Sequence, residues 1–388
     1  MDKSRKLKEK KKFSKKKKII IFVVVLLLAG GGTVAALMLM NKGNLGDAIS
    51  SIVENKEPEK PKFYDNLTGE EVESEEINKK RINCIQIPNG TDARPQVGIS
   101  EAKIVYEAIA EGGITRFAAL YRDAKSDVIG PVRSLRMYYL EWDLPYDCTI
   151  IHAGGVKAAV QRAEKYAHLS ESNTYMWRDY SAYVAPNNLF TSPALLDKFN
   201  SSKNYNESNP KTIARMTPDE SNAEIEAIKN DAEGKYTPAD SIYVHITTAA
   251  NYNVKYTYDP ATNSYLRAYE GKSGKHMDYT CVNTGKSGNK IKPQKDCGKA
   301  TQVAPKVVVV MKVPEELNSD NHYREEITTT GSGEAWIFQN GIVKKVTWNR
   351  KKDTDQLSFT DSDNNEVKLA PGQTFITAVA KKYGYVKY

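Results

Sequence analysis

Two runs of alternating apolar and polar residues, Lys103–Glu111 and Ile114–Arg122, predict a β-hairpin. Gly112–Gly113 separates the runs, and the tight turns of hairpins favour glycine because they need a positive φ. A two-residue turn would make Glu107 and Arg116 diagonal neighbours on one face of the sheet, within reach of an ion pair. The other side chains around Arg116 on that face are apolar. The pattern therefore predicts a charged pair on a mainly apolar face.

The spacing of apolar residues becomes helical after this hairpin. Ser134 can cap a helix that covers residues 134–144 and ends before a proline. The apolar run Cys148–His152 predicts a buried strand, and the spacing over residues 156–167 predicts an amphipathic helix. This alternation of strands and helices predicts a mixed α/β domain, which we place at residues 63–215.

Short strands dominate the chain from residue 240 onward. A helix that opens with a capping box at Thr217–Glu220 covers the connecting segment, residues 216–239. Short turns rich in Gly, Asn and Asp then separate the strand-like runs, a pattern typical of a sandwich or small barrel. The chain is thus predicted to have an α+β fold with a mainly β domain at residues 240–388. The strand-like runs are 241–248, 253–259, 306–313, 324–330, 334–340, 342–348, 356–361 and 374–380.

Residues 19–40 form an apolar run of 22 residues without a charge. About 20 such residues in a helix span a hydrocarbon core of about 30 Å. The basic tail at residues 1–18 would hold the N-terminus in the cytoplasm and leave the C-terminal domains extracellular. A cleaved signal peptide is the alternative, but its apolar region is about 7–15 residues long and ends at an Ala-x-Ala-like site. We therefore expect a single-pass plasma-membrane anchor, followed by a linker at residues 41–62.

The net charge of the chain, +8, comes from this tail. Residues 1–18 carry eleven Lys or Arg against two acidic residues, a balance of +9, so the remaining residues sum to −1. A nearly neutral body offers no basic surface along which a phosphate backbone could lie. We therefore expect no nucleic-acid partner.

Four cysteines lie on the side expected to be exported, where disulfides persist. Cys281 and Cys297 bracket a loop rich in Gly and Lys and are candidates for a disulfide. Cys84 and Cys148 lie in apolar, strand-like runs, where they could pair or remain buried thiols.

A family resemblance is carried by ten segments of the chain: Asn66–Gly69, Ala93–Glu107, Gly112–Arg116, Ile129–Arg136, His152–Gly155, Ala185–Phe190, Tyr265–Arg267, Gly331–Gly341, Thr347–Trp348 and Leu369–Ile376. In these segments the chain resembles the YerB family, cell-surface proteins of Gram-positive bacteria with a two-part domain of unknown function. The resemblance implies a location and a fold, and it implies no activity. Two departures stand out: Asn187 occupies a position where the family usually has histidine, and many members are lipoproteins, whereas this chain has an apolar anchor.

The clearest candidate site combines a Gly-Gly helix start with nearby arginines. The N-terminus of a helix presents free N–H groups to an anion, and arginine binds carboxylate or phosphate with two parallel hydrogen bonds. In the alternative interpretation the glycines are steric, the histidine is a satisfied core residue, and Arg116 pairs with Glu107. The candidate ligand-binding residues are Arg116, Arg133, Arg136, His152, Gly154 and Gly155.

Other chemistry receives less support from the sequence. There is no dinucleotide fingerprint and no metal-ligand spacing, so we expect no cofactor and no metal. Ser134 could be a nucleophile, but it is not in a Gly-x-Ser-x-Gly elbow and a helix cap is the simpler explanation. His276 and Asp278 lie near Arg267 in a β region, where a turn network is the simpler interpretation.

Two functional hypotheses follow. In the first, the chain is an extracytoplasmic binding or scaffold protein of the cell envelope. Its ligand would be an anionic component such as peptidoglycan or a wall polymer. In the alternative, it is an envelope hydrolase or transferase that uses His152 with Glu107 or Ser134. No recognisable catalytic set is present, so the sequence favours binding over enzyme activity.

Overall fold

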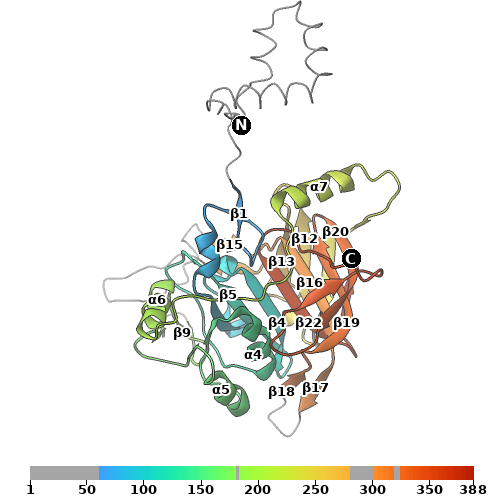
Figure 1. Ribbon diagram of the computed structural model, residues 1–388. Coiled ribbons are helices and arrows are strands. Elements are labelled where there is room, and N and C mark those ends of the chain that lie inside the picture. The colour runs from blue at the N-terminus through green and yellow to red at the C-terminus, as the bar shows by residue number, and fades with distance from the viewer. Residues whose placement is uncertain (1–60, 181–182, 280–299, 319–323) are drawn as a thin grey trace, which may run out of the picture. The chain divides into compact units, whose positions relative to one another are not determined.

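One large mixed β-sheet runs through the computed structural model, which describes residues 61–180, 183–279, 300–318 and 324–388 (Figure 1). From Lys62 to Tyr388 the chain forms one compact unit. The predicted tail, the predicted anchor at 19–40, residues 41–60 of the linker, and the Cys281–Cys297 pair lie outside the described residues. Within the described ranges, no helix has the length and apolar character needed to cross a membrane.

The main path of this sheet contains ten strands. Two further strands, β17 (Glu315–Asn318) and β18 (Arg324–Ile327), pair with each other, and β21 (Ser358–Thr360) pairs with β20. In spatial order the path is β10 (Thr237–Pro238), β20 (Ile342–Arg350), β19 (Gly331–Gln339), β16 (Val307–Val313), β22 (Thr374–Ala380), β4 (Ile104–Glu111), β5 (Ile114–Tyr121), β3 (Asn83–Pro88), β6 (Thr149–Ile151) and β7 (His168–Leu169).

Strand β22 joins early and late parts of the chain within this sheet. It lies parallel to β16 on one side and parallel to β4 on the other, with Thr374 opposite Ile104 and Phe375 opposite Val105. Strands from residues 63–215 and from residues 240–388 are therefore hydrogen-bonded into one sheet. The long strands β16, β19, β20 and β22 overlap the strand-like runs expected from the sequence, and the fold is mixed α+β with mostly β content.

The smaller sheets are antiparallel. A four-stranded sheet contains only strands from beyond residue 240, and three two-stranded sheets involve short segments. The four-stranded sheet has the order β13 (Ser264–Tyr269), β12 (Val254–Asp259), β11 (Ser241–His245) and β23 (Tyr385–Lys387). The pairs are β1 (Phe63–Tyr64) with β2 (Glu71–Val72), β8 (Trp177–Arg178) with β9 (Leu189–Phe190), and β14 (Met277–Tyr279) with β15 (Ala300–Gln302).

Helices connect the strands, and their capping follows the sequence in two cases. The capping box at Thr217 and Glu220 is formed in α7, and Ser192 caps α6 by accepting a hydrogen bond from the Leu195 amide. The α-helices are α4 (Met137–Asp143), α5 (Lys157–Ala163), α6 (Pro193–Ser202) and α7 (Pro218–Lys229). The 3₁₀ helices are η1 (Glu75–Lys79), η2 (Thr91–Ala93), η3 (Ile99–Glu101), η4 (Leu144–Tyr146) and η5 (Ala250–Tyr252).

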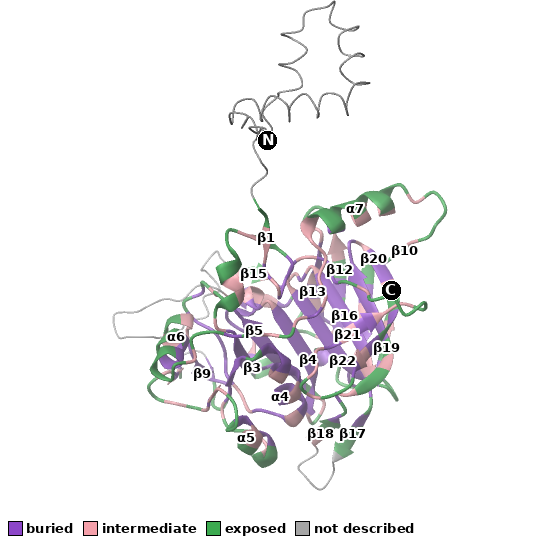
Figure 2. Cartoon of the chain, in the orientation of Figure 1, coloured by how far each residue is buried: buried purple, intermediate pink, exposed green. Residues whose placement is uncertain are grey.

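The run of four valines in β16 is buried on both faces of the large sheet. Val307 and Val309 belong to an apolar cluster that includes Trp142 of α4. Val308 and Val310 belong to another cluster, with side chains of the four-stranded sheet. A strand covered on both faces has no polar side, so its sequence is continuously apolar rather than alternating. Figure 2 shows the buried residues concentrated in these central strands.

A disulfide joins Cys84 in β3 to Cys148, one residue before β6. The S–S distance is 2.02 Å, and both residues are buried. Because β3 and β6 are parallel neighbours with Cys84 opposite Ile150, the chain brings these cysteines together although 64 positions separate them. Of the two alternatives for this pair, the structure shows the disulfide.

Candidate anion-binding site

A β-bulge changes the register predicted for the hairpin of β4 and β5. Glu111 lies opposite Ile114 as a two-residue turn requires, but the pairing shifts between Ile109 and Glu111. Arg116 therefore faces Ala108, and Glu107 faces Phe117. One extra residue in a strand moves the preceding side chains to the other face. The predicted pairing of Glu107 with Arg116 is wrong for this reason.

Arg116 instead shares the carboxylate of Glu111 with Arg136. The Nη2 atom of Arg116 lies 3.0 Å from Glu111 Oε1, and Nη2 of Arg136 lies 2.6 Å from Oε2. Both arginines are buried, with exposed fractions of 5 % and 6 %. Burial raises the pKa of Glu111, but the two guanidinium groups outweigh it and hold this pKa below its usual range. Glu111 is therefore ionised at neutral pH and balances one of the two positive charges.

Arg133 is the third arginine of this group and is only half-buried. Its Nε donates to Asn187 Oδ1 at 3.2 Å, and the Asn187 amide donates to Asp92 at 2.8 Å. Arg133 forms no ion pair with any residue that the structure describes. Burial lowers the pKa of Arg133, and the positive charge of Arg116 lowers it further. Three guanidinium groups thus gather around one directly bound carboxylate, with Asp92 as a more distant acid.

The His-Ala-Gly-Gly segment lies beside the backbone that carries these arginines. The Ala153 amide donates to the Arg133 carbonyl at 3.0 Å, and the Leu135 amide donates to the Gly154 carbonyl at 3.0 Å. The candidate residues, 20 positions apart in the sequence, are therefore neighbours at the level of the backbone. The structure thus brings the His-Ala-Gly-Gly segment and the arginine segment together, as the anion-site hypothesis requires.

The side chain of His152 is buried. Its Nδ1 lies 2.8 Å from the Gly154 carbonyl, and its Nε2 has no hydrogen-bond partner among the described atoms. Burial lowers the pKa of His152, so the ring is neutral at pH 7. Neither Glu107 nor Ser134 hydrogen-bonds to this ring. The contacts therefore give no acid–base pair of the kind that the enzyme hypothesis needs.

The two glycines have different roles: Gly154 has a positive φ of +63° and no atom within 4 Å of an added Cβ, whereas Gly155 has a steric role. A Cβ on Gly155 would lie 2.8 Å from the Leu135 carbonyl oxygen, so a side chain would separate these segments. Helix α5 begins only at Lys157, has seven residues, and lacks a side-chain cap. Gly154 and Gly155 therefore lie before the N-cap residue, Val156, and are not part of the first turn of the helix.

Ser134 does not cap a helix, contrary to the prediction. Helix α4 begins at Met137, with Arg136 in the N-cap position. The preceding residues are extended because Leu135 forms a parallel bridge with Gly155. The Ser134 carbonyl accepts a hydrogen bond from Arg116 at 2.6 Å, so this residue contributes its backbone to the arginine group.

A second polar group, centred on Glu107 and Arg267, is buried inside the molecule. Arg267 Nη2 donates to both carboxylate oxygens of Glu107, at 2.9 and 2.8 Å, and both side chains are fully buried. The Arg267 guanidinium also contacts His276, which in turn contacts Gln96 at 3.0 Å. The predicted turn network around His276 thus extends to Glu107, 160 positions from Arg267. The sequence analysis did not identify this group as a pair with Glu107. A sequence feature that could have indicated it is the charge of Arg267, which lies on the same face of β13 as the buried Tyr265 and Tyr269.

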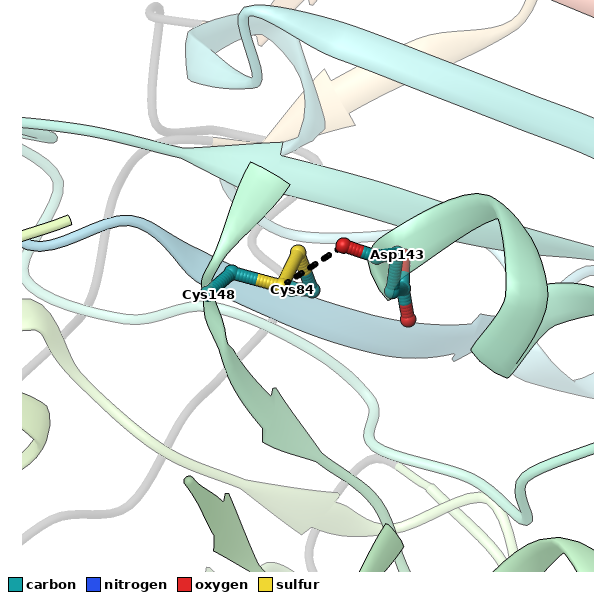
Figure 3. A group of neighbouring side chains, drawn as sticks. All are labelled: Cys84, Asp143 and Cys148. Atoms are coloured by element: carbon teal, nitrogen blue, oxygen red, sulfur yellow. Dashed lines mark hydrogen bonds between the residues drawn. A yellow bond between two sulfur atoms is a disulfide. The ribbon is translucent and has the colours of Figure 1, made fainter. Parts of the chain in front are cut away.

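One group of metal-ligating residue types occurs in the described ranges, at Cys84, Cys148 and Asp143 (Figure 3). The two sulfur atoms are bonded to each other and offer no thiolates. Asp143 accepts a hydrogen bond from Gln86 at 2.8 Å, and burial raises its pKa well above the usual range. The arrangement is a disulfide beside a neutral carboxylic acid, which does not suit a metal cation.

The fold and the two-part organisation match a known family. Residues 67–206 match the N-terminal domain, and residues 243–376 the C-terminal domain, of a protein family of unknown function, DUF3048. This chain belongs to that two-part, YerB-like family.

One relative is YerB of Bacillus subtilis (strain 168), whose name describes it as a candidate lipoprotein. The two are 27 % identical over 322 residues, which cover 81 % of this chain and 85 % of YerB. The crystal structure of the YerB protein from Bacillus subtilis has a TM-score of 0.64 at 22 % identity and covers 84 % of this chain and 100 % of that one. The structural likeness shows that the two share a fold.

Proposed function

We propose that this chain is a membrane-anchored binding protein of the cell envelope and that Arg116, Arg133 and Arg136 bind an anionic wall component. The observation that carries the proposal is the excess of positive charge, since Arg116 and Arg136 share the single carboxylate of Glu111 and Arg133 adds a third guanidinium group nearby. Arg133 is half-exposed and has no ion pair among the described residues, so it is the group available to a ligand.

The chemistry of the ligand follows from these donors. Guanidinium groups bind carboxylates and phosphates through paired hydrogen bonds, which are about twice as strong as neutral ones. Peptidoglycan stem peptides carry carboxylates and wall glycopolymers carry phosphates, so both meet the requirement. The lipoprotein description of YerB supports an envelope location. In this proposal residues 19–40 anchor the chain in the membrane. The domains at residues 63–215 and 240–388 lie outside the cell.

The rival hypothesis of a hydrolase or transferase has no comparable support. Glu107 is held by Arg267, and His152 is buried with its Nδ1 bound to a backbone carbonyl. In the described part of the chain, the His152 side chain forms no hydrogen bond with Glu107 or Ser134.

The test is binding of the full-length chain, purified in detergent, to insoluble wall material. Arg133→Ala should weaken binding about tenfold, because one charge-assisted hydrogen bond contributes roughly 1.5–3 kcal/mol. Lys351→Ala is the matched control, since Lys351 is exposed and lies outside the arginine group. Walls stripped of glycopolymer distinguish phosphate from carboxylate ligands. Equal binding by wild type and Arg133→Ala would exclude the proposed site.

A further inference from the structure

A separate cleft lies between helix α6 and the ends of β3 and β5. Its volume is about 340 Å³, and it shares no lining residue with the arginine group. Ligand sites for small molecules begin at about 300 Å³, so the cleft can hold a compound of a few residues at most. Its size admits a small molecule or the end of a longer chain.

One wall of the cleft is a single face of α6. Pro193, Leu196, Asp197, Asn200 and Ser201 follow helical spacing and all line it. Asp197 forms no ion pair with any described residue. Burial raises the pKa of Asp197, and the nearby carboxylate of Asp123 raises it further. Asp197 is exposed to solvent, so its carboxylate can meet a ligand cation without first breaking an ion pair.

The opposite wall carries three cations and one acid. Lys80 and Lys125 both pair with Asp123, at 2.6 and 2.8 Å. The side chain of Arg81 is 9 % exposed, and its one ion pair among the described residues, with Asp147, is 3.9 Å long. Its Nη2 has no hydrogen-bond partner in the described part of the chain. A buried N–H without an acceptor costs about 1–3 kcal/mol, which a ligand oxygen in the cleft would offset.

Neutral amides lie between these charged walls. The Asn200 side chain donates to Asn83 Oδ1 at 3.0 Å and accepts from Thr149 at 2.7 Å. Both asparagines are nearly buried and line the cleft. Amides fixed in this way suit a ligand with polar groups between its charged ends.

We propose that this cleft binds a small zwitterion, a free amino acid or the dipeptide end of a peptide. Its ammonium group would lie at Asp197 and its carboxylate toward Arg81 and Lys80. An anion without a cationic group would leave the Asp197 carboxylate without a partner, and an apolar ligand would leave the charged walls unsolvated. A zwitterion is the ligand class that provides both a cation for Asp197 and an acceptor for the Nη2 of Arg81, which has no hydrogen-bond partner among the described residues. This site is independent of the arginine group, so Arg133→Ala leaves it unchanged.

The experiment measures binding of L-alanyl-L-alanine and D-alanyl-D-alanine to the full-length chain in detergent by ligand-observed NMR titration. The N-acetylated dipeptide removes the ammonium group, and the C-terminal amide removes the carboxylate. Each blocked form should bind about tenfold more weakly than the free dipeptide, since each loses a charge-assisted contact. Preference for the D form would identify a wall peptide as the source, and equal or better binding of the L form an ordinary peptide.

Variants separate recognition from folding. Asp197→Asn should weaken the free dipeptide about tenfold while leaving the N-acetylated form unchanged, because only the free form presents an ammonium group. Lys198→Gln is the matched control on the same helix, exposed and not part of the lining. The proposal fails if neither dipeptide binds saturably, or if Asp197→Asn weakens both forms equally.

Discussion

At the scale of single residues, the buried pair of Glu107 and Arg267 is the most consequential contact that distant parts of the chain create. Each charge is fully buried, and each is neutralised by the other together with neighbouring polar groups. Removing one partner leaves the other as an uncompensated buried charge, which costs far more than the pair contributes to stability.

Arg267→Met should therefore lower the free energy of unfolding by about 3–5 kcal/mol. Urea denaturation followed by fluorescence measures the change. The double variant Arg267→Met with Glu107→Gln should recover part of the loss, because no bare carboxylate remains. A matched surface pair is Lys229 with Glu226, where Lys229→Ala should change stability by less than about 0.5 kcal/mol. A small effect of Arg267→Met alone would contradict the interpretation.

The buried carboxyl group of Asp143 should make the free energy of unfolding depend on pH. Burial raises the pKa of Asp143 well above its usual value, so the folded state keeps this proton at pH values where the unfolded state has lost it. Stability must then fall as pH rises from about 4, the unfolded pKa of aspartate, toward the folded pKa.

In Asp143→Asn this contribution to the slope should disappear, and the variant should gain on wild type as pH rises from about 4 to 7. Urea midpoints measured at several pH values under non-reducing conditions provide the test. The difference between the two proteins isolates Asp143 from other titrating groups. A difference that does not depend on pH would show that this carboxyl group is ionised in the folded state.

At the scale of elements, the turn of the β4–β5 hairpin contains two neighbouring glycines that differ in how much space surrounds them. Gly112 and Gly113 both have positive φ, +58° and +73°. A Cβ on Gly112 would meet no atom within 4 Å, whereas one on Gly113 would lie 2.8 Å from Thr247 Oγ1. Alanine at either position incurs the same backbone cost, of about 1–2 kcal/mol. Only Gly113 adds a steric term.

Gly113→Ala should therefore destabilise the protein more than Gly112→Ala, as measured by thermal and urea unfolding. In a Thr247→Ala background the difference between the two glycine variants should shrink. If it persists in that background, the contact with Thr247 is not its cause.

At the scale of the whole molecule, residues 19–40 are predicted to hold the extracellular unit at the membrane. Deletion of 19–40 should move the chain from the membrane fraction to the aqueous fraction after cell disruption, because the remaining sequence has no other apolar run of that length. Carbonate extraction of the intact chain provides the second measurement. An intact chain released by carbonate would contradict a spanning helix.

Prediction from the sequence succeeded where the physics is local or periodic. Three predicted features are of this kind: the hairpin glycines, the capping box of α7 and the continuous apolar run of β16. Each is set by residues that are close together in the sequence. Prediction failed at Ser134, because Leu135 pairs with Gly155 and keeps the preceding backbone extended. It failed at Glu107 because a bulge is a choice between two nearly equal registers, decided by what each face must contact.

The candidate site shows the same division. The sequence by itself identified Arg116, Arg133 and Arg136 as a group and fixed the order of strands and helices, since composition and spacing carry that information. Only the tertiary structure decided that Glu111 is their shared partner, that Arg267 reaches Glu107, that Cys84 pairs with Cys148, and that β22 joins β4. Each of these contacts depends on side-chain facing or on segments far apart in the chain, and such contacts are selected by the packing of the whole sheet.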